Sequence, residues 1–399
     1  MCHADPMRRF DVAERRARLA RRHHLSPAHR AADVVAAADG VVCLHATDPA
    51  TVHLAAWARV DDLAVADVDK ALYADRTLVK HLCMRRTLFV LRRELFGVVQ
   101  AAASERVAEQ ERRRLAKDVE KAGLVDDGAA WLAEATAATL DALDRLGEAT
   151  STELRAAVGL LRGSTVYAPH KPYGGEVPVG PRVLTCLSAA GRIVRASNRG
   201  GWTTSRPAWA PTATWLGAEP AVPPERVARA ELVQRWLRAF GPATPADLKW
   251  WLGSTVAAVR TALADVGAVD VDLQGEPGVA LPDDLDPVAP PEPWAALLPA
   301  LDPTTMGWYH RDWFLGPHRS ALFDGSGNGG TTAWWDGRIV GGWAQAPDGE
   351  VVLQLLEDVG GEAEAALGRE AARLTGWLDG VRVAPRFPSP LSRARAPSS

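Results

Sequence analysis

An internal repeat constrains the fold of this chain more than any other feature of its sequence. Residues 143–159 align without gaps on residues 237–253, an offset of 94 positions (237 − 143). Both segments read Leu-x-x-x-Gly-x-Ala-Thr-x-x-acid-Leu, and four further residues lead to a second glycine. The first glycine can end a helix, and a threonine followed three residues later by an acid forms a capping box. The repeat therefore predicts two similar pairs of helices joined by a short turn.

A third helix is predicted after each copy of the repeat, ending in Leu-x-x-x-Gly at residues 187–191 and 263–267. After each of these glycines come a short strand, a glycine-containing turn and another strand, in "IVRASNRGGWTTS" and "VDVDLQGEPGVAL". Three helices followed by a β-hairpin is the element order of a winged helix. Winged helices bind DNA in many proteins, but in multidomain proteins they often mediate protein contacts, so both roles remain open.

The N-terminal region has a comparable pattern of helices followed by a strand. Predicted helices cover residues 8–22, 28–38, 49–59 and 67–82, a strand covers 87–91, and a long amphipathic helix covers 94–122.

Beyond residue 281 the composition changes, and "LPDDLDPVAPPEP" is predicted to be an extended linker. The following region alternates apolar residues with tight-turn signals, of which "WDGR" favours a hairpin. A helix is expected over residues 362–378 and a disordered tail after it. The predicted fold class is α+β, with tandem winged-helix units followed by a β-rich, barrel-like domain. The expected domains are residues 1–125, 126–215, 216–285, 286–385 and the tail 386–399.

Composition places the chain among ordinary globular proteins. Of 399 residues, 47% are hydrophobic and 24% charged, and no apolar run approaches the roughly 20 residues that span a bilayer, so no membrane partner is expected. The basic N-terminus lacks the apolar core of a secretory signal, and the four cysteines are scattered, which favours a reducing cytoplasm. The net charge of −3 gives no global reason to bind nucleic acid, but basic residues cluster within 8–30, 80–93 and 112–117. Such a cluster can contact phosphates or can be a solvated helix face.

Common catalytic motifs are missing from the sequence. "GSGNGG" at residues 325–330 lacks the Lys-Ser/Thr of a phosphate-binding loop and is predicted to be a β-turn. There is no HExxH, no nucleophile elbow, and no metal-like spacing among the ten histidines. No cofactor or metal is therefore expected.

The stretch "GVVCLHATDPATVHLAAWARV" places an imidazole and a hydroxyl, His45 and Thr47, directly before a helix start. Asp48 is a good N-cap and Pro49 suits the first helical position. The simplest interpretation is a packed histidine and a threonine that helps the cap.

A specific resemblance supports a second interpretation. The Asp-Pro helix start after an apolar strand, "RTLVKHLCMRRTLFVL", "ATPADLKWWLG" and "MGWYHRDWFLG…GNGGTTAWWDGRIVGGW" are together similar to the AlkZ/YcaQ family of winged-helix DNA glycosylases, over nearly the whole chain. In that family a Gln-x-Gln or Gln-x-Asp catalytic motif lies immediately before the Asp-Pro. His45 and Thr47 occupy those two positions here.

The resemblance implies a monofunctional DNA glycosylase that removes N7-alkylguanine adducts, including bulky lesions made by a genotoxic natural product. Catalysis would depend on His45 and Thr47. The expected partner is double-stranded DNA carrying alkylated bases, bound by a monomer in the cytoplasm near the nucleoid. Expected DNA contacts come from Arg85, Arg86, His310, Arg311 and Arg338.

Alternatives exist for several of these residues. Arg85 and Arg86 could be solvent-facing strand ends, and Arg311 could pair with a neighbouring aspartate. Trp250 and Trp251 are expected to be core residues. For the whole chain, the alternative is a non-catalytic winged-helix protein that binds DNA or regulates a partner.

Overall fold

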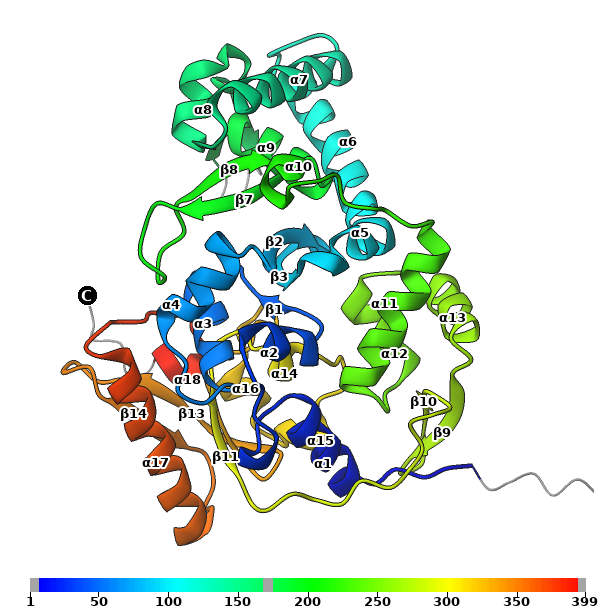
Figure 1. The fold of residues 1–399 in the computed structure, drawn as a ribbon, viewed down its shortest axis with the longest axis vertical. Coiled ribbons are helices and arrows are strands. Elements are labelled where there is room, and N and C mark those ends of the chain that lie inside the picture. The colour runs from blue at the N-terminus through cyan, green and yellow to red at the C-terminus, as the bar shows by residue number, and fades with distance from the viewer. Residues whose placement is uncertain (1–6, 168–174, 394–399) are drawn as a thin grey trace, which may run out of the picture. The chain divides into compact units, whose positions relative to one another are not determined.

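A computed structural model describes residues 7–167 and 175–393 of the chain (Figure 1). The chain separates into two compact units. The terminal unit comprises residues 1–71 and 230–399, and the middle unit comprises residues 72–229. Both units mix helices with small antiparallel sheets, so the expectation of a mixed helix-and-strand fold is confirmed.

The middle unit begins with a hairpin and continues through a long, locally irregular helical segment into the first copy of the repeat. Its elements are β2 Leu78–Cys83, η3 Met84–Arg86, β3 Thr87–Arg92, η4 Arg93–Leu95, α5 Phe96–Val99, η5 Gln100–Ser104, α6 Glu105–Lys121, α7 Gly128–Leu146, β4 Ala149–Thr150, α8 Ser151–Ala157, η6 Gly159–Leu161, β5 Ser164–Tyr167, β6 Gly175–Pro178, α9 Val179–Ala189, β7 Ile193–Asn198, β8 Pro207–Pro211 and α10 Thr212–Leu216.

The terminal unit contains the N-terminal helices, the second copy of the repeat and the C-terminal sheet. Its elements are α1 Val12–Arg22, η1 Pro27–His29, α2 Val34–Gly40, β1 Leu44–His45, α3 Pro49–Trp57, α4 Val65–Asp69, α12 Pro245–Leu252, α13 Val256–Asp265, β9 Val269–Leu273, β10 Glu276–Ala280, β11 Ala295–Leu298, α14 Pro303–Met306, α15 Asp312–Leu315, α16 Arg319–Leu322, β12 Thr332–Trp335, β13 Arg338–Gln345, β14 Val351–Leu355, α17 Gly360–Leu378 and α18 Pro390–Arg393. Two elements cross the boundary between the units, η2 Lys70–Ala74 and α11 Glu225–Phe240.

The capping signals of the repeat are confirmed in both copies. Thr150 caps α8 and Thr244 caps α12, each with its hydroxyl accepting from the backbone N–H three residues later at 3.2 Å. The acids Glu153 and Asp247 complete the boxes by accepting from the backbone N–H of the capping threonine, at 2.6 Å and 2.9 Å. The predicted helix starts therefore follow from a local pattern that the structure reproduces twice.

The equivalence of the two copies extends from the helices into the sheets. Ala149 pairs with Trp209 in β8, while Ala243, its counterpart, forms a bridge with Val279 in β10. In each copy, the alanine before the capping threonine thus pairs with a strand of the hairpin that follows the third helix. The first copy also contains an inserted hairpin, β5 with β6, between its second and third helices.

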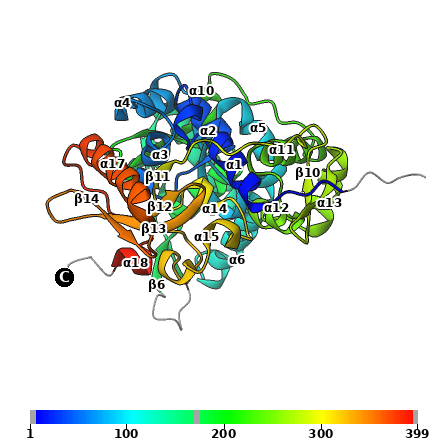
Figure 2. The same ribbon diagram turned by 90° about the horizontal axis from the view of Figure 1, so that it is seen from below.

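The C-terminal region forms an open antiparallel sheet in the order β11-β12-β13-β14. Helix α17 packs on this sheet against β11, β12 and β14 (Figure 2). The expected hairpin at "WDGR" is confirmed, because Trp335 pairs with Arg338 around Asp336 and Gly337, both at positive φ. The strands in the described residues close no barrel, so the barrel-like description is replaced by an open sheet covered by a helix.

One predicted helix, residues 67–82, is wrong in its second half. The helical segment ends before Arg76, which has a φ of +54°, and residues 78–83 instead form β2. Strand β2 pairs in register with β3, from Leu78 opposite Arg92 to Cys83 opposite Thr87. Long-range pairing with a strongly apolar partner strand outweighs the local helical pattern.

The end of the chain also differs from the expectation of disorder. Residues 390–393 form the short helix α18, and Ser389 is fully buried. Proline and serine are common in disordered tails, but here a backbone N–H of the segment, that of Arg386, donates a hydrogen bond to the Asp48 side chain of the terminal unit. Residues 394–399, the remainder of the predicted tail, lie outside the described residues.

Among the residues described, no helix is long and apolar enough to cross a bilayer.

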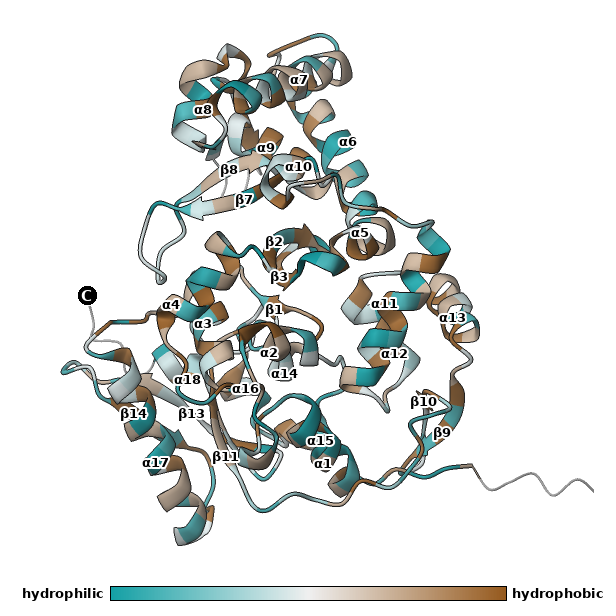
Figure 3. Cartoon of the chain, in the orientation of Figure 1, coloured by the Kyte–Doolittle hydropathy of each residue, from teal (hydrophilic) through white to brown (hydrophobic). Residues whose placement is uncertain are grey.

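The arginine-rich helix α1 is drawn mostly in the hydrophilic colour (Figure 3), yet Ala17, Arg18, Leu19 and Ala20 on it are buried.

Candidate active site and nucleic-acid interface

The turn that carries the candidate catalytic residues contains a strained backbone position. Val42 is buried and has a φ of +64°, a conformation that a β-branched residue adopts only rarely. Its N–H donates to the carbonyl of Asp39 at 2.9 Å, and the next N–H, of Cys43, donates to Val41 at 2.7 Å. Strain of this kind costs roughly 1–3 kcal/mol and is concentrated at functional sites. The tight turn directs the chain into Leu44–His45.

His45 and Thr47 are in direct contact. The backbone N–H of Thr47 donates to Nδ1 of His45 at 3.4 Å, a long hydrogen bond. His45 is 7% exposed and Thr47 is half-buried. Because Nδ1 accepts this bond, a neutral ring in this geometry carries its proton on Nε2.

Asp48 ends the turn and caps α3, as the sequence predicts. Its Oδ1 accepts from the N–H of Ala50 at 3.1 Å, while its Oδ2 accepts from the backbone N–H of Arg386 at 2.8 Å. Burial raises the pKa of the Asp48 carboxyl, and the hydrogen bonds from Arg386 and Ala50 and the positive charge of Arg386 oppose that rise. The guanidinium of Arg386 also donates to the carbonyl of Thr47 at 3.4 Å. No sequence signal pointed to Arg386, because it lies in a segment whose composition is typical of disorder.

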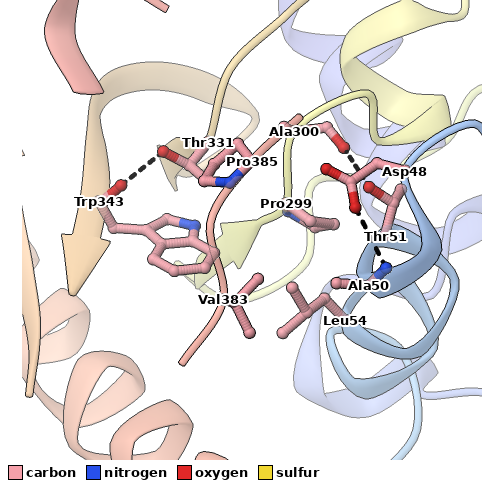
Figure 4. A pocket seen from close by; sticks show the side chains of 10 residues that line it. All are labelled: Asp48, Ala50, Thr51, Leu54, Pro299, Ala300, Thr331, Trp343, Val383 and Pro385. Atoms are coloured by element: carbon pink, nitrogen blue, oxygen red, sulfur yellow. Dashed lines mark hydrogen bonds between the residues drawn. The ribbon is translucent and has the colours of Figure 1, made fainter. Parts of the chain in front are cut away.

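A small pocket lies beside Asp48 (Figure 4). The side chains of α3 line one side, and the ring of Trp343 with the C-terminal segment lines the other. It is lined by Asp48, Ala50, Thr51, Leu54, Pro299, Ala300, Thr331, Trp343, Val383 and Pro385. Its volume of about 10 Å³ holds roughly one water molecule. Ligand pockets usually measure several hundred Å³, so this one is far too small for a nucleobase.

Arg85 and Arg86 lie at the tip of the hairpin formed by β2 and β3, in the middle unit. Both have positive φ values, +56° and +60°. Arg86 is exposed and pairs with Glu111 at 3.0 Å, whereas Arg85 is half-buried. The sequence placed them ahead of a strand, and the structure places them on the turn between two strands.

His310 and Arg311 belong to the terminal unit and differ in exposure. His310 is exposed, and its Nδ1 lies 3.2 Å from the Thr244 hydroxyl at the start of α12. Arg311 is only 4% exposed, donates to the carbonyl of Trp308 at 2.6 Å, and stacks over the ring of Trp250. This burial favours a packing role for Arg311. Trp250 itself is partly exposed, which differs from its expected place in the core.

Arg338 begins β13 and forms an ion pair with Glu357. His318 approaches the same carboxylate, with its Nε2 at 3.0 Å. The Arg338 side chain is 36% exposed, so part of it still reaches solvent despite the ion pair. No described contact joins it to His45 or Thr47.

The basic cluster at the N-terminus is neutralised within the terminal unit. Arg18, which is 2% exposed, pairs with Glu14 at 3.0 Å and with Asp284 at 2.7 Å, and Arg22 pairs with the same aspartate. The acidic linker thus binds the arginines of α1. These residues form neither a solvated face nor a cationic surface.

A more open cationic element is the loop between β7 and β8 in the middle unit. Asn198 organises it: its Nδ2 donates to the carbonyls of Gly200, Gly201 and Thr204 at 3.1, 3.1 and 2.9 Å. Its Oδ1 accepts from the N–H of Arg206 at 2.8 Å. One side chain therefore satisfies four backbone groups and fixes the loop.

Two exposed arginines, Arg199 and Arg206, flank this loop. Arg199 lies 3.7 Å from Glu148, a distance typical of a weak surface pair. The sequence predicted the hairpin but did not select these arginines. The sequence does contain a feature that could have identified them, since arginines, glycines and hydroxyl residues occur together in "NRGGWTTSR".

Comparison with known proteins bears on the whole chain. The family model described as "DNA glycosylase AlkZ-like" matches residues 38–377. The structure is similar to that of the Streptomyces sahachiroi DNA glycosylase AlkZ, with a TM-score of 0.71 and 22% identity over 95% of this chain and 99% of the other. At that identity the structural similarity concerns the fold alone. No curated protein matches the sequence.

Proposed function

The chain belongs to the AlkZ-like DNA glycosylase family, and we propose that this DNA glycosylase excises N7-alkylguanine adducts, including bulky adducts of a genotoxic natural product. The observation that carries the proposal is the position of His45 and Thr47. They contact each other after the strained turn at Val42 and directly before the capped start of α3, at the positions that match the family's catalytic motif.

The chemistry of the substrate is compatible with a site that has few polar groups. Alkylation at N7 gives the base a positive charge, which weakens the glycosidic bond, and the base then leaves without being protonated. The enzyme has to hold a water below C1′ and to stabilise the positive charge that develops on the sugar. Two polar side chains and a nearby carboxylate on a rigid turn are sufficient groups for that task.

We assign the water-activating role to His45 and the water-orienting role to the Thr47 hydroxyl. A neutral His45 can accept a proton from the water, whereas a protonated ring would repel the cationic sugar. Because Nδ1 is the acceptor nitrogen of the neutral ring and accepts the long bond from the Thr47 N–H, proton transfer to this ring requires that bond to break. The bond is long and therefore weak, so breaking it costs little.

The fold supports DNA as the partner. We propose that both copies of the repeat are winged helices, because each has three helices, a capped second helix and a terminal hairpin that pairs with the residue before the cap. Arg85, Arg86 and His310 would contact phosphates, together with Arg199 and Arg206 on the organised loop; Arg338 would do so through its exposed side. Such contacts position a protein on DNA without selecting a sequence.

The small size of the pocket beside Asp48 bears on how a bulky lesion would be held. Enzymes that flip a base enclose it in a snug cavity. The pocket beside Asp48 has room for about one water, so we propose that the adduct remains in an open site and that a large substituent is tolerated. The protein would act as a monomer, in the cytoplasm, without a cofactor.

The test is base release from defined DNA. Duplexes carrying N7-methylguanine, or a bulky N7 adduct, are incubated with excess enzyme, and abasic sites are revealed by heat or alkali. We expect release of the modified base with unmodified guanine left in place. DNA binding without release from either duplex would favour the non-catalytic winged-helix alternative, and the absence of salt-dependent DNA binding would exclude both.

A further inference from the structure

The C-terminal strap, residues 381–393, connects the open sheet of the terminal unit to the turn that carries His45 and Thr47. At its start, Gln345 of β13 holds the strap by two bonds: its Oε1 accepts from the N–H of Val383 at 2.8 Å and its Nε2 donates to the carbonyl of Val381 at 3.0 Å. Further along, Ser389 is fully buried, and a side chain at Gly330 would collide with it at 2.6 Å. The strap is therefore fixed at both ends.

Between these anchors the strap lies against the catalytic turn. Val383 and Pro385 line the pocket beside Asp48 (Figure 4). The next residue, Arg386, donates its backbone N–H to Asp48 at 2.8 Å, across 338 positions of sequence, and its guanidinium to the Thr47 carbonyl at 3.4 Å. One residue of the strap thus binds both the carboxylate that caps α3 and the carbonyl just before it.

We propose that residues 381–386 of the strap are part of the active site and that Arg386 is a positioning residue that holds Thr47 and Asp48 in the orientation needed for hydrolysis. The proposal rests on the proposed function of His45 and Thr47. It concerns a segment outside residues 38–377, which the family model matches.

The physical reason lies in the peptide that joins Thr47 to Asp48. The Thr47 carbonyl is bound at one side of this peptide, and the Asp48 side chain is bound at the other. If both bonds are broken, only the bond from Ala50 still restrains the carboxylate, and the preceding peptide can rotate. Rotation moves the Thr47 hydroxyl and the N–H that contacts His45. A displacement of about 1 Å at reacting groups can lower a rate by roughly 100-fold.

Two variants separate the strap's contacts. Arg386→Ala removes the guanidinium and keeps the backbone N–H. Gln345→Ala removes the anchor that holds residues 381 and 383, and leaves Arg386 chemically intact. The matched control is Arg393→Ala, because Arg393 is an exposed arginine of the same strap and its replacement removes the same charge.

The rate of base release from N7-methylguanine DNA is measured in single turnover at saturating enzyme, beside the Kd for undamaged DNA and the melting temperature. We expect Gln345→Ala, which releases the segment that carries both Arg386 bonds, to lower the rate by roughly 10- to 100-fold. Arg386→Ala, which removes only the 3.4 Å bond to the Thr47 carbonyl, should lower the rate by a smaller factor. The Kd should change less than about threefold, because the contacts are internal, and Arg393→Ala should match the unchanged protein. Folded variants with unchanged rates, or an equal rate loss in Arg393→Ala, would overturn the proposal.

A second measurement does not depend on catalysis. Carbon-detected NMR titration of the Asp48 carboxyl reports its pKa, which the charge of Arg386 holds down against the effect of burial. Arg386→Ala should raise that pKa, and Arg393→Ala should leave it unchanged. If no base is released by the unchanged protein but the titration shifts, the proposed function fails while the contact stands. If the titration does not shift, the Arg386 guanidinium does not act on Asp48 and the positioning role of this side chain is excluded.

Discussion

Arg59 and Asp302 form an ion pair from which solvent is completely excluded. Both guanidinium ends are bound, with Nη1 at 2.8 Å from Oδ2 and Nη2 at 2.7 Å from Oδ1, and both side chains are 0% exposed. The pair joins the end of α3 to the segment before α14. Arg59→Met would leave the carboxylate buried without its partner, which costs about 3–5 kcal/mol. We expect a loss of that size in the free energy of unfolding, measured by urea titration.

The control for this prediction is an exposed pair in the same unit. Arg235 pairs with Glu231 at 3.0 Å, with both side chains more than a third exposed. Arg235→Ala should change stability by less than about 1 kcal/mol, because solvent screens the pair. Equal losses in the two variants would show that burial does not determine the strength of the Arg59 pair.

The same buried network predicts a dependence of stability on pH. His23 is fully buried: its Nδ1 lies 2.8 Å from the Thr304 hydroxyl and its Nε2 lies 3.2 Å from the Ala239 carbonyl. Burial, and next the charge of Arg59, lower its pKa well below the ordinary value. The unfolded chain therefore takes up a proton as the pH falls below about 6.5, while the folded chain does not. Stability is fully present above that pH and is lost as the pH falls.

The expected slope is up to about 1.4 kcal/mol per pH unit for this one histidine. His23→Gln should reduce the slope measured between pH 6.5 and pH 5, because the amide does not titrate. His81 of the middle unit, whose pKa burial lowers to about 3, acts in the same direction and leaves a residual slope. An unchanged slope in His23→Gln would mean that His23 is protonated in the folded protein.

The two capping boxes should differ in their contribution to stability. Glu153 is exposed and serves only its own helix, whereas the buried Asp247 also accepts from the backbone N–H groups of Tyr309 and His310, at 2.9 and 2.8 Å. Glu153→Ala should lower the free energy of unfolding only slightly, because solvent screens an exposed carboxylate. Asp247→Ala should cost at least about 3 kcal/mol, since several hydrogen bonds to a charged group are removed together. Equal costs in urea titration would contradict this difference.

These boxes also show how far the sequence could predict the fold. Helix starts at Thr150 and Thr244, glycine helix ends and the tight hairpin at Asp336–Gly337 are local signals, so they were predicted correctly. Strand β2 was missed because its pairing with β3 is not a local property. The same holds for the open C-terminal sheet, since the number of strands that pair cannot be derived from turn signals.

For the candidate site, the sequence identified the turn but not what holds it. His45, Thr47 and the cap at Asp48 follow from local pattern and from the resemblance. Arg386 binds the Asp48 carboxylate through its backbone N–H, which every residue except proline has, so this contact leaves no signal in the sequence. Arg311 was expected to contact DNA or to pair with a neighbouring aspartate, yet it is buried and stacked on Trp250.

The proposed phosphate binding at the β2–β3 turn leads to a prediction about affinity for DNA. Replacing Arg85 and Arg86 by Ala should weaken binding to damaged and undamaged DNA alike, because phosphates are the same in both. The slope of log affinity against log salt should become shallower by about 0.9 for each phosphate that is no longer neutralised. Arg113→Ala is the control, since Arg113 is an exposed arginine on α6 that already pairs with Glu109. A slope that matches the control would remove Arg85 and Arg86 from the interface.

The final prediction concerns the roles of His45 and Thr47. If His45 accepts the proton of the attacking water, His45→Ala should lower single-turnover base release by about 100-fold or more. Binding of the adduct should change far less, because the interaction matters mainly in the transition state. Thr47→Val removes the hydroxyl with little change in shape, so it should slow release without lowering the melting temperature.

The packing interpretation predicts the opposite pattern, and pH separates the two further. A buried structural histidine, replaced by alanine, lowers the melting temperature and leaves the rate per folded molecule nearly unchanged. A proton-accepting His45 gives a rate that falls at low pH, because a protonated ring can no longer accept the proton of the water. His45→Ala should then lose this dependence together with the rate. If both variants release the base normally, the strained turn at Val42 serves only to start α3, and the hydrolytic water is held elsewhere.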